Sequence, residues 1–561
     1  MIDLLIKRDI NLKNEILSGL TVALALVPEA VAFSFVAGVD PSIGLWAAFI
    51  VGFTTSLLGG RPGMISGATG AMAVVMTAFV VLYGLEYLFA AVILCGVIQI
   101  LCGVFGAGRF VRLLPHSVML GFVNGLAIVI GLAQFNQLKE RHSIIFNEHT
   151  HGFEVVGEWM TGSTMWITAM LIVLTMAIIH FLPKLTKAVP GTLVAIVAVT
   201  LLVQLTPIES ITVSDSVATM NALTREKSEK TQLFEGEKPT LAYASVNGRG
   251  HEIAASDIEI SEEQAEERAG YFSIPAIPFN LESLGIIAGL AATLAAIGLI
   301  ESLMTLTLID ELTKTRGQSN RECVAQGIAN MASGFFGAMG GCAMIGQSMI
   351  NIRSGGRHRL SGITAALFLL CFIVYPPLWQ CIGLIPVPAL IGVMFIVVIA
   401  TFEWTSLRLW NKIPRSDFFV IVAVSVITVF LDLAIAVAAG VVISALVFAW
   451  KKSQRINAEV TEEEGVKRYE LEGPLFFGAV TSFKEIFTPA DDPDTVNIEF
   501  TNTRVYDHSA LEAINGVTAE YRDLGKKVIL TNLSEDCQNL LNRAEPILEV
   551  TAGEQDYYTA G

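Results

Sequence analysis

The chain has 561 residues, of which 53% are hydrophobic and only 16% are charged. It is too apolar and too long to form a single soluble core. Its net charge of −16 argues against a nucleic-acid surface. These numbers predict a polytopic α-helical membrane protein whose main surroundings are a lipid bilayer.

Apolar runs long enough to cross about 30 Å of hydrocarbon as helices recur along the chain. Two of them, at 64–83 and 343–352, contain glycine-rich breaks and are expected to be part helix and part extended chain. Such a segment is stable in a membrane only where its backbone faces protein or a cavity. The fourteen predicted spans are 17–37, 43–59, 64–83, 86–106, 116–136, 163–183, 188–206, 284–309, 322–339, 343–352, 361–382, 384–402, 417–432 and 434–450.

Lys and Arg gather in every second gap between these spans, as they do in short cytoplasmic loops. The N-terminus carries Lys7, Arg8 and Lys13, and the last span is followed by Lys451 and Lys452. The pattern predicts a multi-pass protein of the cell (inner) membrane with both termini in the cytoplasm. The first helix is expected to be retained, because no cleavage site precedes it.

Seven predicted spans precede a long polar insert and seven follow it. An odd number of spans inverts the second copy, so the layout predicts two repeats of opposite orientation. The predicted domains are a first membrane repeat at 1–206, an extracytoplasmic insert at 207–280, a second membrane repeat at 281–450 and a cytoplasmic domain at 451–561.

The last 105 or so residues alternate strand-like and helix-like runs, which predicts a small α/β domain with one sheet. Asp507 or Ser509 is expected to cap the first helix of this pattern. The strand-like runs are VKRYELEG, PLFFGA, VNIEFTNT and KKVILTNL, and the helix-like runs extend from Ser509 to Arg522 and from Glu535 to Arg543.

Glu301 lies inside an apolar span, where a carboxylate costs roughly 2.5–3.5 kcal/mol and usually faces a cavity or a partner. Thr305 follows one turn later, so the carboxylate and the hydroxyl share a helix face. The two residues are the predicted coupling-ion site, either for Na⁺ through oxygen ligands or for a proton on Glu301. The structural alternative is a buried carboxylate that bonds a neighbouring helix end.

Glu29 is the second acid inside a span, directly after Pro28. Its predicted role is a secondary one in gating. Because a proline breaks the helix hydrogen-bond pattern, the carboxylate could equally serve to satisfy the broken backbone.

The two glycine-rich breaks occupy matching places, about forty residues after each of these acids. If each break starts a half-helix, two helix N-termini with free N–H groups point at one site in the middle of the membrane and favour a small oxyanion there. Close helix packing is the alternative reason for the glycines. The predicted anion-binding residues are Ser66, Gly67, Ala68, Thr69, Gly70, Ala343, Met344, Ile345, Gly346 and Gln347.

The soluble parts contain no nucleophile and base pattern, and the seven cysteines show no metal-ligand spacing. We therefore expect no enzymatic activity, no metal site and no cofactor apart from Na⁺ as a coupling ion.

Several segments together resemble the sulfate permease (SulP) family of anion transporters, and the C-terminal part resembles its STAS domain. The resemblance covers nearly the whole chain except the insert. The segments that carry it are LVPEAVAFSFVAGVDPSIGLWAAFIVG, SGATGAMAVVM, GFVNGLAIVI and AQGIANMASGFFGAMGGCAMIGQSMINIRSGG.

This resemblance implies fourteen spans in core and gate domains, a homodimer, and an anion site between the third and tenth spans. Thr69 and its neighbours, with Ala343, Met344 and Ile345, match that site. Glu301 and Thr305 match an acid and a hydroxyl that help to bind Na⁺ in sodium-coupled bicarbonate members. Gln347 stands where many relatives have Arg, and Glu301 stands where the sodium-dependent type has Asp, so the resemblance does not identify the anion.

The sequence thus predicts a secondary active transporter of a small inorganic oxyanion, bicarbonate or sulfate, coupled to Na⁺ or H⁺. One alternative is a transporter of dicarboxylates or other organic anions. Another is a membrane-anchored scaffold or sensor whose STAS-like domain binds a cytoplasmic partner. Ser509, in the sequence Asp507-His508-Ser509, is a candidate phosphorylation site.

Overall fold

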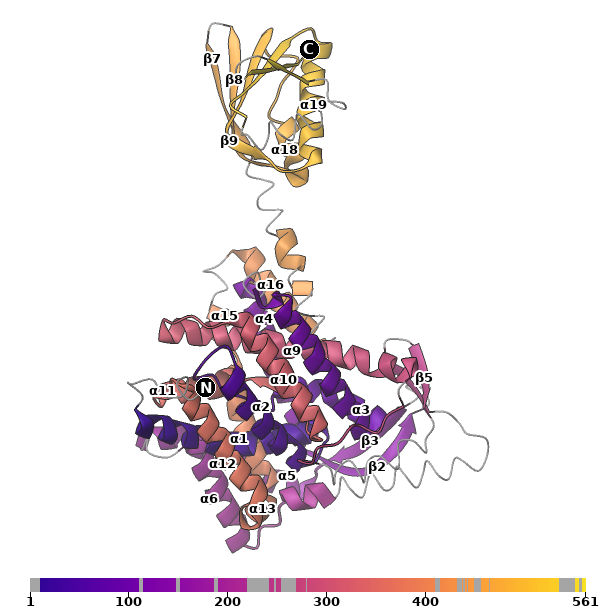
Figure 1. Cartoon of the computed structure of the whole chain (residues 1–561), viewed down its shortest axis with the longest axis vertical. Coiled ribbons are helices and arrows are strands. Elements are labelled where there is room, and N and C mark those ends of the chain that lie inside the picture. The colour runs from indigo at the N-terminus through magenta and orange to yellow at the C-terminus, as the bar shows by residue number, and fades with distance from the viewer. Residues whose placement is uncertain are drawn as a thin grey trace. The chain divides into compact units, whose positions relative to one another are not determined.

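The computed structural model describes the chain with several gaps. The chain divides into two compact units, 1–440 and 441–561 (Figure 1). The described residues are 11–109, 115–147, 152–185, 190–218, 242–246, 249–253, 269–278, 280–408, 414–430, 436, 439–440, 442–447, 456–463, 465–533, 550–553 and 557–560.

The first unit is mainly helical. Its helices are α1 (Leu12–Ala37), α2 (Pro41–Leu58), α3 (Gly70–Val104), α4 (His116–Asn136), α5 (Gly162–Leu185), α6 (Gly191–Leu205), α9 (Leu281–Thr313), α10 (Ser319–Phe335), α11 (Ile345–Arg353), α12 (Arg359–Val374), α13 (Pro376–Gly383), α14 (Val387–Thr401), α15 (Thr405–Arg408) and α16 (Arg415–Phe430). Its strands are β1 (Ser66–Gly67), β2 (Lys139–Asn147), β3 (Gly152–Trp159), β4 (Ala242–Val246), β5 (Arg249–Ile253) and β6 (Cys342–Ala343).

Seven of the described helices are long and apolar enough to cross a membrane, and α12 with α13 would make an eighth, broken span. Several predicted spans are shorter helices here, namely α6, α10, α11 and α16, with 9 to 17 residues. Of the predicted span at 434–450, residues 436, 439–440 and 442–447 are described, and they are helical. The multi-pass helical fold agrees with the sequence, and the number of fourteen spans stays a prediction.

One predicted break agrees with the structure, and one predicted span is not continuous. The third and fourth spans, predicted at 64–83 and 86–106, meet within α3 at a kink at Gly84, whose φ of 80° leaves the helical region. The span predicted at 361–382 is two helices bent by 83° after Tyr375. Pro376 and Pro377 explain the bend, because a proline lacks the N–H group and disfavours helical geometry in the residue before it.

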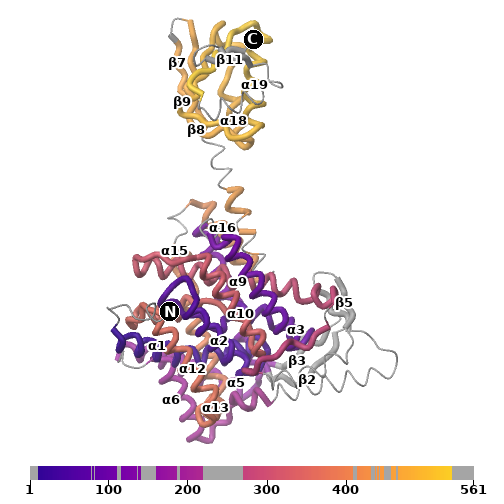
Figure 2. Tube along the Cα trace, viewed as in Figure 1, coloured from indigo at the N-terminus to yellow at the C-terminus, as the bar shows by residue number. Residues whose placement is uncertain are grey.

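Helices far apart in the sequence pack side by side in two groups, as the chain trace in Figure 2 lets the reader follow. One group contains α1, α2, α3, α9, α10, α11 and α12. The other contains α4, α5, α6, α14 and α16, and contacts the first through pairs such as α1 with α14. This division is consistent with the core and gate domains that the resemblance implies.

The order helix, helix, short strand, helix occurs twice in the first group, once as α1, α2, β1, α3 and once as α9, α10, β6, α11. The two short strands pair antiparallel, with Ser66 opposite Ala343 and Gly67 opposite Cys342. Antiparallel pairing of equivalent strands is the geometry expected for two repeats of opposite orientation.

The second unit has a six-stranded sheet in the order β11-β12-β10-β9-β8-β7. β8 (Val466–Leu475), β9 (Thr495–Val505) and β10 (Lys527–Thr531) are parallel, and β7 (Asn457–Glu463), β11 (Val550–Gly553) and β12 (Tyr557–Ala560) are antiparallel to their neighbours.

Two of the helices described in this unit are α18 (Val480–Lys484) and α19 (His508–Asp523). Both contribute to its buried core, through Phe483 and Ile514 among others. The predicted strand in PLFFGA was wrong, because β8 ends at Leu475 and a short 3-10 helix, η3 (Phe477–Ala479), follows. The helix predicted at Glu535–Arg543 lies outside the described residues.

Candidate functional site

The two glycine-rich breaks meet at the β1–β6 pair, in the middle of the first helix group. Beyond the strand pairing, the Met344 amide donates to the Ile65 carbonyl at 2.9 Å. The Ile65 amide in turn donates to Ser348 Oγ at 2.9 Å. A side chain at position 341 would place its Cβ 2.2 Å from the Gly67 carbonyl oxygen, so only glycine permits this close crossing.

Three buried polar side chains on α10, spaced four residues apart, hold the crossing in place. Glu322 accepts the Gly60 amide at 2.7 Å, Gln326 donates to Ser66 Oγ at 2.8 Å and Asn330 accepts the Gly341 amide at 2.8 Å. All three are fully buried. We call this set the α10 polar ridge, and it connects α10 to the segments on both sides of the crossing.

Each break is followed by a helix start. α3 begins at Gly70 after Thr69, and α11 begins at Ile345 after Met344. At these two starts neither preceding residue caps the helix with its side chain. The first-turn N–H groups are therefore available to an anion, with the positive ends of both helix dipoles behind them.

The two starts differ in their surroundings. Gly70 is packed tightly, since a Cβ there would lie 2.7 Å from Phe33 and 2.8 Å from Ile130. Gly346 is exposed, and a Cβ there would meet nothing within 4 Å. The first turn of α11 therefore borders open space. In contrast, the residues that precede α3, namely Ser66, Gly67, Ala68 and Thr69, are buried.

Glu301 is half-buried and lies beside the β1–β6 pair. Its carboxylate accepts a hydrogen bond from the Cys342 thiol at 3.0 Å. Cys342 Sγ also lies 3.2 Å from Thr69 Oγ1. A chain of polar contacts thus runs from the predicted coupling acid to the residue that precedes α3.

Thr305 shares the helix face of Glu301 but does not bond its carboxylate. The Thr305 hydroxyl donates to the main-chain oxygen of Glu301 at 2.8 Å and lies 3.4 Å from the Ala343 oxygen. Ser302, between them, accepts the Ala343 amide at 3.1 Å. Helix α9 therefore contacts β6 through polar groups on two consecutive turns.

Glu29 lies on α1 and is 6% exposed. Its carboxylate accepts a hydrogen bond of 2.6 Å from the Gln347 side chain, in the first turn of α11. The structure thus connects Glu29 to the predicted anion site instead of to the backbone next to Pro28.

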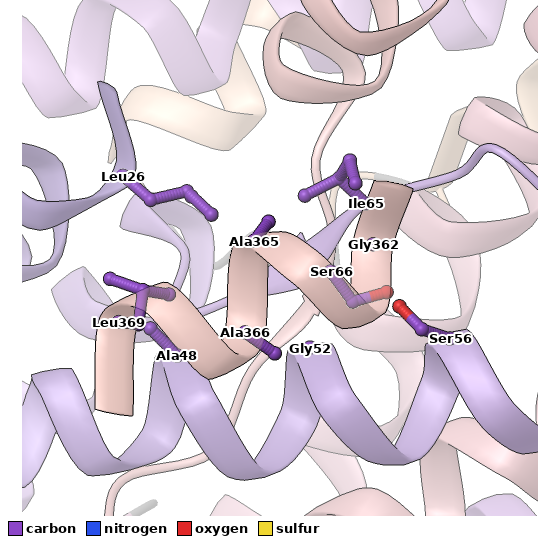
Figure 3. Close-up of a pocket in the computed structure, with 10 residues that line it drawn as sticks. All are labelled: Leu26, Ala48, Gly52, Ser56, Ile65, Ser66, Gly362, Ala365, Ala366 and Leu369. Atoms are coloured by element: carbon purple, nitrogen blue, oxygen red, sulfur yellow. The ribbon is translucent and has the colours of Figure 1, made fainter. Parts of the chain in front are cut away.

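A small gap lies behind the crossing, between α2 and α12, as Figure 3 shows. It is lined mainly by small and aliphatic residues, including Ala48, Gly52, Ala366 and Leu369. Ser66 borders it from the side of β1. Because apolar side chains dominate its walls, it has the character of a packing gap and not of an anion site.

Two other polar groups connect helices away from the crossing. Asp310 lies 3.2 Å from the buried Arg61 guanidinium and accepts the Gly317 amide. Asn124 donates to Ser406 at 2.8 Å and accepts the Glu403 amide at 2.9 Å.

In the second unit, Asp507 caps α19 by accepting the Ala510 amide at 2.9 Å. Asp507 also accepts the Phe477 amide at 2.7 Å. Ser509 is half-buried in the first turn of the same helix. Phosphorylation of Ser509 stays a prediction.

Sequence reasoning did not identify Cys342 or the α10 polar ridge. The ridge had a detectable signal, because Glu322, Gln326 and Asn330 repeat at intervals of four on one helix face. Cys342 had none, since its importance comes from its position between Thr69 and Glu301.

Comparisons with known proteins agree with this arrangement. The sulfate permease family matches residues 12–424, and the STAS domain matches residues 457–547. A putative sulfate transporter of Bacillus subtilis, YbaR, is 36% identical over 95% of this chain and 97% of its own length. The bicarbonate transporter BicA of Picosynechococcus is 26% identical over 95% of this chain and 91% of its own.

Among solved structures, the transmembrane domain of a cyanobacterial bicarbonate transporter BicA is similar, with a TM-score of 0.58, 28% identity, and coverage of 77% of this chain and 99% of that one. SLC26A9 has the same fold, with a TM-score of 0.66, 15% identity, and coverage of 95% and 86%. The chain belongs to the sulfate permease family of membrane transporters and carries a C-terminal STAS domain.

Proposed function

We propose that the protein is a secondary active transporter of a small inorganic oxyanion, sulfate or bicarbonate, coupled to a cation at Glu301. The observation that carries this proposal is the pairing of two uncapped helix starts through β1 and β6, with Glu301 beside them. The names of the relatives, sulfate and bicarbonate transporters, support these two anions.

The anion would accept hydrogen bonds from the first-turn amides of α3 and α11. Within the described ranges, the two helices that follow the crossing, α3 and α11, contain one Lys or Arg side chain. It is Arg353, at the far end of α11. Binding therefore depends on the helix dipoles and the amides, which supply a partial positive charge without a cationic side chain. The exposed Gly346 lets an oxyanion approach the α11 backbone closely.

For the cation we propose a proton. The Glu301 carboxylate has a thiol as its hydrogen-bond donor, and sulfur is a poor ligand for a hard cation such as Na⁺. One observation favours Na⁺ as a second candidate. The Thr305 hydroxyl oxygen and the Ala343 carbonyl oxygen lie 3.4 Å apart beside Glu301 and could supply oxygen ligands.

The test is uptake into liposomes that contain the purified full-length chain. Radiolabelled sulfate and bicarbonate are supplied with no gradient, with an inward proton gradient and with an inward Na⁺ gradient, and bicarbonate data are corrected for leakage of CO₂. We expect uptake of one of the two anions to be accelerated by the proton gradient. Acceleration by Na⁺ alone would assign Na⁺ as the coupling ion. No uptake of either anion would contradict the proposal.

Glu301→Gln is the informative variant, because it keeps the side-chain shape and removes the charge. We expect normal membrane insertion and loss of at least about tenfold in gradient-driven uptake, which corresponds to about 1.4 kcal/mol of coupling. Glu282→Gln, in the exposed first turn of the same helix, is the matched control and should behave as wild type. Unchanged coupling in Glu301→Gln would remove Glu301 from the mechanism.

We further propose that the protein functions as a homodimer in the cell (inner) membrane with both termini in the cytoplasm, where the STAS domain can bind a partner. The resemblance and the distribution of basic residues support this arrangement. Uptake competition by dicarboxylates would identify the organic-anion alternative. Retained transport with loss of a partner complex after STAS deletion would favour the scaffold function.

A further inference from the structure

The Glu29 side chain is a poorly compensated acid beside the crossing. It is 6% exposed, and the Gln347 amide that donates to it is electrically neutral. An ionised carboxylate with one neutral donor is costly in this position. It also places a negative charge beside the first turn of α11, where the proposed anion binds, and the two like charges repel each other.

Charged groups on the neighbouring helices do not relieve this repulsion within the described residues. α1 packs against α2, α3, α6, α11, α12 and α14, and α2, α6 and α14 contain no Asp, Glu, Lys, Arg or His. The titratable groups on the rest are Tyr83, Glu86, Tyr87, Cys95 and Cys102 on α3, Arg353 on α11, and Arg359 and Cys371 on α12; on α1 itself they are Lys13 and Glu15.

The charged members of this set are engaged elsewhere or stand at helix ends. Glu86 accepts the Ala276 amide, Glu15 accepts the amides that start α12, and Arg359 donates to the last carbonyls of α2. Arg353 closes the far end of α11. Protonation is therefore the direct way to neutralise Glu29 when an anion binds.

Gln347 gives this protonation a structural consequence. Its Nε2 donates to Glu29, while its Oε1 is buried and has no hydrogen-bond partner. A protonated Glu29 needs an acceptor, and the Gln347 amide supplies one after a rotation of 180° that exchanges its oxygen and nitrogen. The unpartnered Oε1 position is then occupied by an N–H donor.

We propose that Glu29 is a second proton-binding acid of the transport site and that Gln347 converts its protonation into anion binding. With Glu29 ionised, the amide presents a lone pair beside the start of α11. With Glu29 protonated, the amide accepts the Glu29 O–H and presents an N–H group to the anion. One proton is taken up from solution on Glu29, no covalent bond other than the O–H bond changes, and by reciprocity a bound anion favours that proton.

This inference rests on the proposed anion transport but not on the role of Glu301. The test measures the KM for uptake of radiolabelled sulfate from pH 5.5 to 8.5 and of radiolabelled bicarbonate from pH 7.0 to 8.5. Bicarbonate concentrations are expressed as the bicarbonate ion. In the wild-type protein we expect KM to fall about tenfold as the pH falls and Glu29 becomes protonated.

Two variants separate the charge of Glu29 from the rotation of the amide. Glu29→Gln mimics the protonated acid, so its KM should stay near the low-pH value of the wild type at every pH. Gln347→Met removes the donor but keeps Glu29, so its KM should rise mainly at low pH, where the wild-type amide donates to the anion. Glu282→Gln is the control for the removal of a charge outside the site.

The outcomes separate this inference from the proposed function. A wild-type protein that takes up neither anion would contradict both. Wild-type uptake with the same pH dependence of KM in Glu29→Gln would overturn the role of Glu29 alone. A Gln347→Met variant with an equal rise in KM at all pH values would overturn the rotation of the amide. If Glu29→Gln failed to insert, the low-pH effect in Gln347→Met would still decide.

Discussion

Asp492 in the second unit is a carboxylate without solvent contact that remains ionised. It accepts hydrogen bonds from Lys467 at 2.5 Å, Tyr469 at 2.8 Å, Thr488 at 2.9 Å and also from Tyr521. Burial works against ionisation, but these four donors hold the pKa of Asp492 below its usual range. The hydrogen bond between Lys467 and Asp492 also raises the pKa of Lys467. The cluster joins β8 and α19 to the loop before β9.

Asp492→Asn should destabilise the STAS unit by about 2 kcal/mol, because it leaves a charged lysine and two buried hydroxyls with a weaker acceptor. Since the pKa of Asp492 is lower in the folded state, its contribution is complete above the unfolded value near 3.8 and is lost as the pH falls through the folded value. Urea unfolding of residues 451–561 at several pH values measures this.

The difference between wild type and Asp492→Asn should therefore be constant near neutral pH and shrink in acid. Glu459→Gln, on the exposed β7, is the control and should change stability by less than about 0.5 kcal/mol. A difference independent of pH down to pH 2 would contradict the assignment of the stabilisation to the ionised carboxylate.

Sequence reasoning found some residues of the site and not others for a physical reason. Glu29 and Glu301 could be identified because a carboxylate in an apolar span is costly and therefore conspicuous. The Glu29–Gln347 contact could not be predicted, since it joins residues 318 positions apart. Cys342 was missed because a cysteine in a span resembles any small apolar residue until its neighbours are known.

The β1–β6 crossing is the element on which the site depends. Gly341→Ala should disrupt it, because the new Cβ would lie 2.2 Å from the Gly67 carbonyl oxygen and the strands would have to separate. We expect anion uptake to fall more than about tenfold while the protein still inserts and remains monodisperse in detergent. Uptake into liposomes and size-exclusion chromatography measure the two properties.

Gly289→Ala is the matched control for this substitution. Gly289 lies in α9, and a Cβ there would meet nothing within 4 Å, so alanine should be tolerated and should favour the helix slightly. Normal uptake by Gly341→Ala would show that the close crossing is not required for transport.

Elements were predictable where local chemistry decides them. The breaks before α3 and α11 followed from glycine clusters in apolar spans, and α19 followed from its period and its cap at Asp507. The pairing of β1 with β6 depends on the packing of both repeats, which local sequence does not specify. The bend after Tyr375 had a local signal in Pro376 and Pro377, but the apolar run hid it.

The two units of the molecule have separate cores. The second unit has a hydrophobic core made by residues of its own sheet and helices, such as Tyr469, Phe500 and Ile514. The β1–β6 crossing, the α10 polar ridge and the Glu29–Gln347 pair lie wholly in the first unit. Folding of the anion site should therefore not require the STAS domain.

Deletion of residues 456–561 tests this independence. Because both repeats remain intact, the shortened chain should insert, bind sulfate or bicarbonate with a KM within about threefold of wild type, and keep the pH dependence assigned to Glu29. The maximal rate is free to change, since a cytoplasmic domain can regulate movement without touching the site. Uptake kinetics at pH 5.5 and 8.5 separate the two parameters. A well-folded deletion variant whose KM no longer responded to pH would show that the STAS domain helps to form the anion site, and the separation of the two units would then not hold for function.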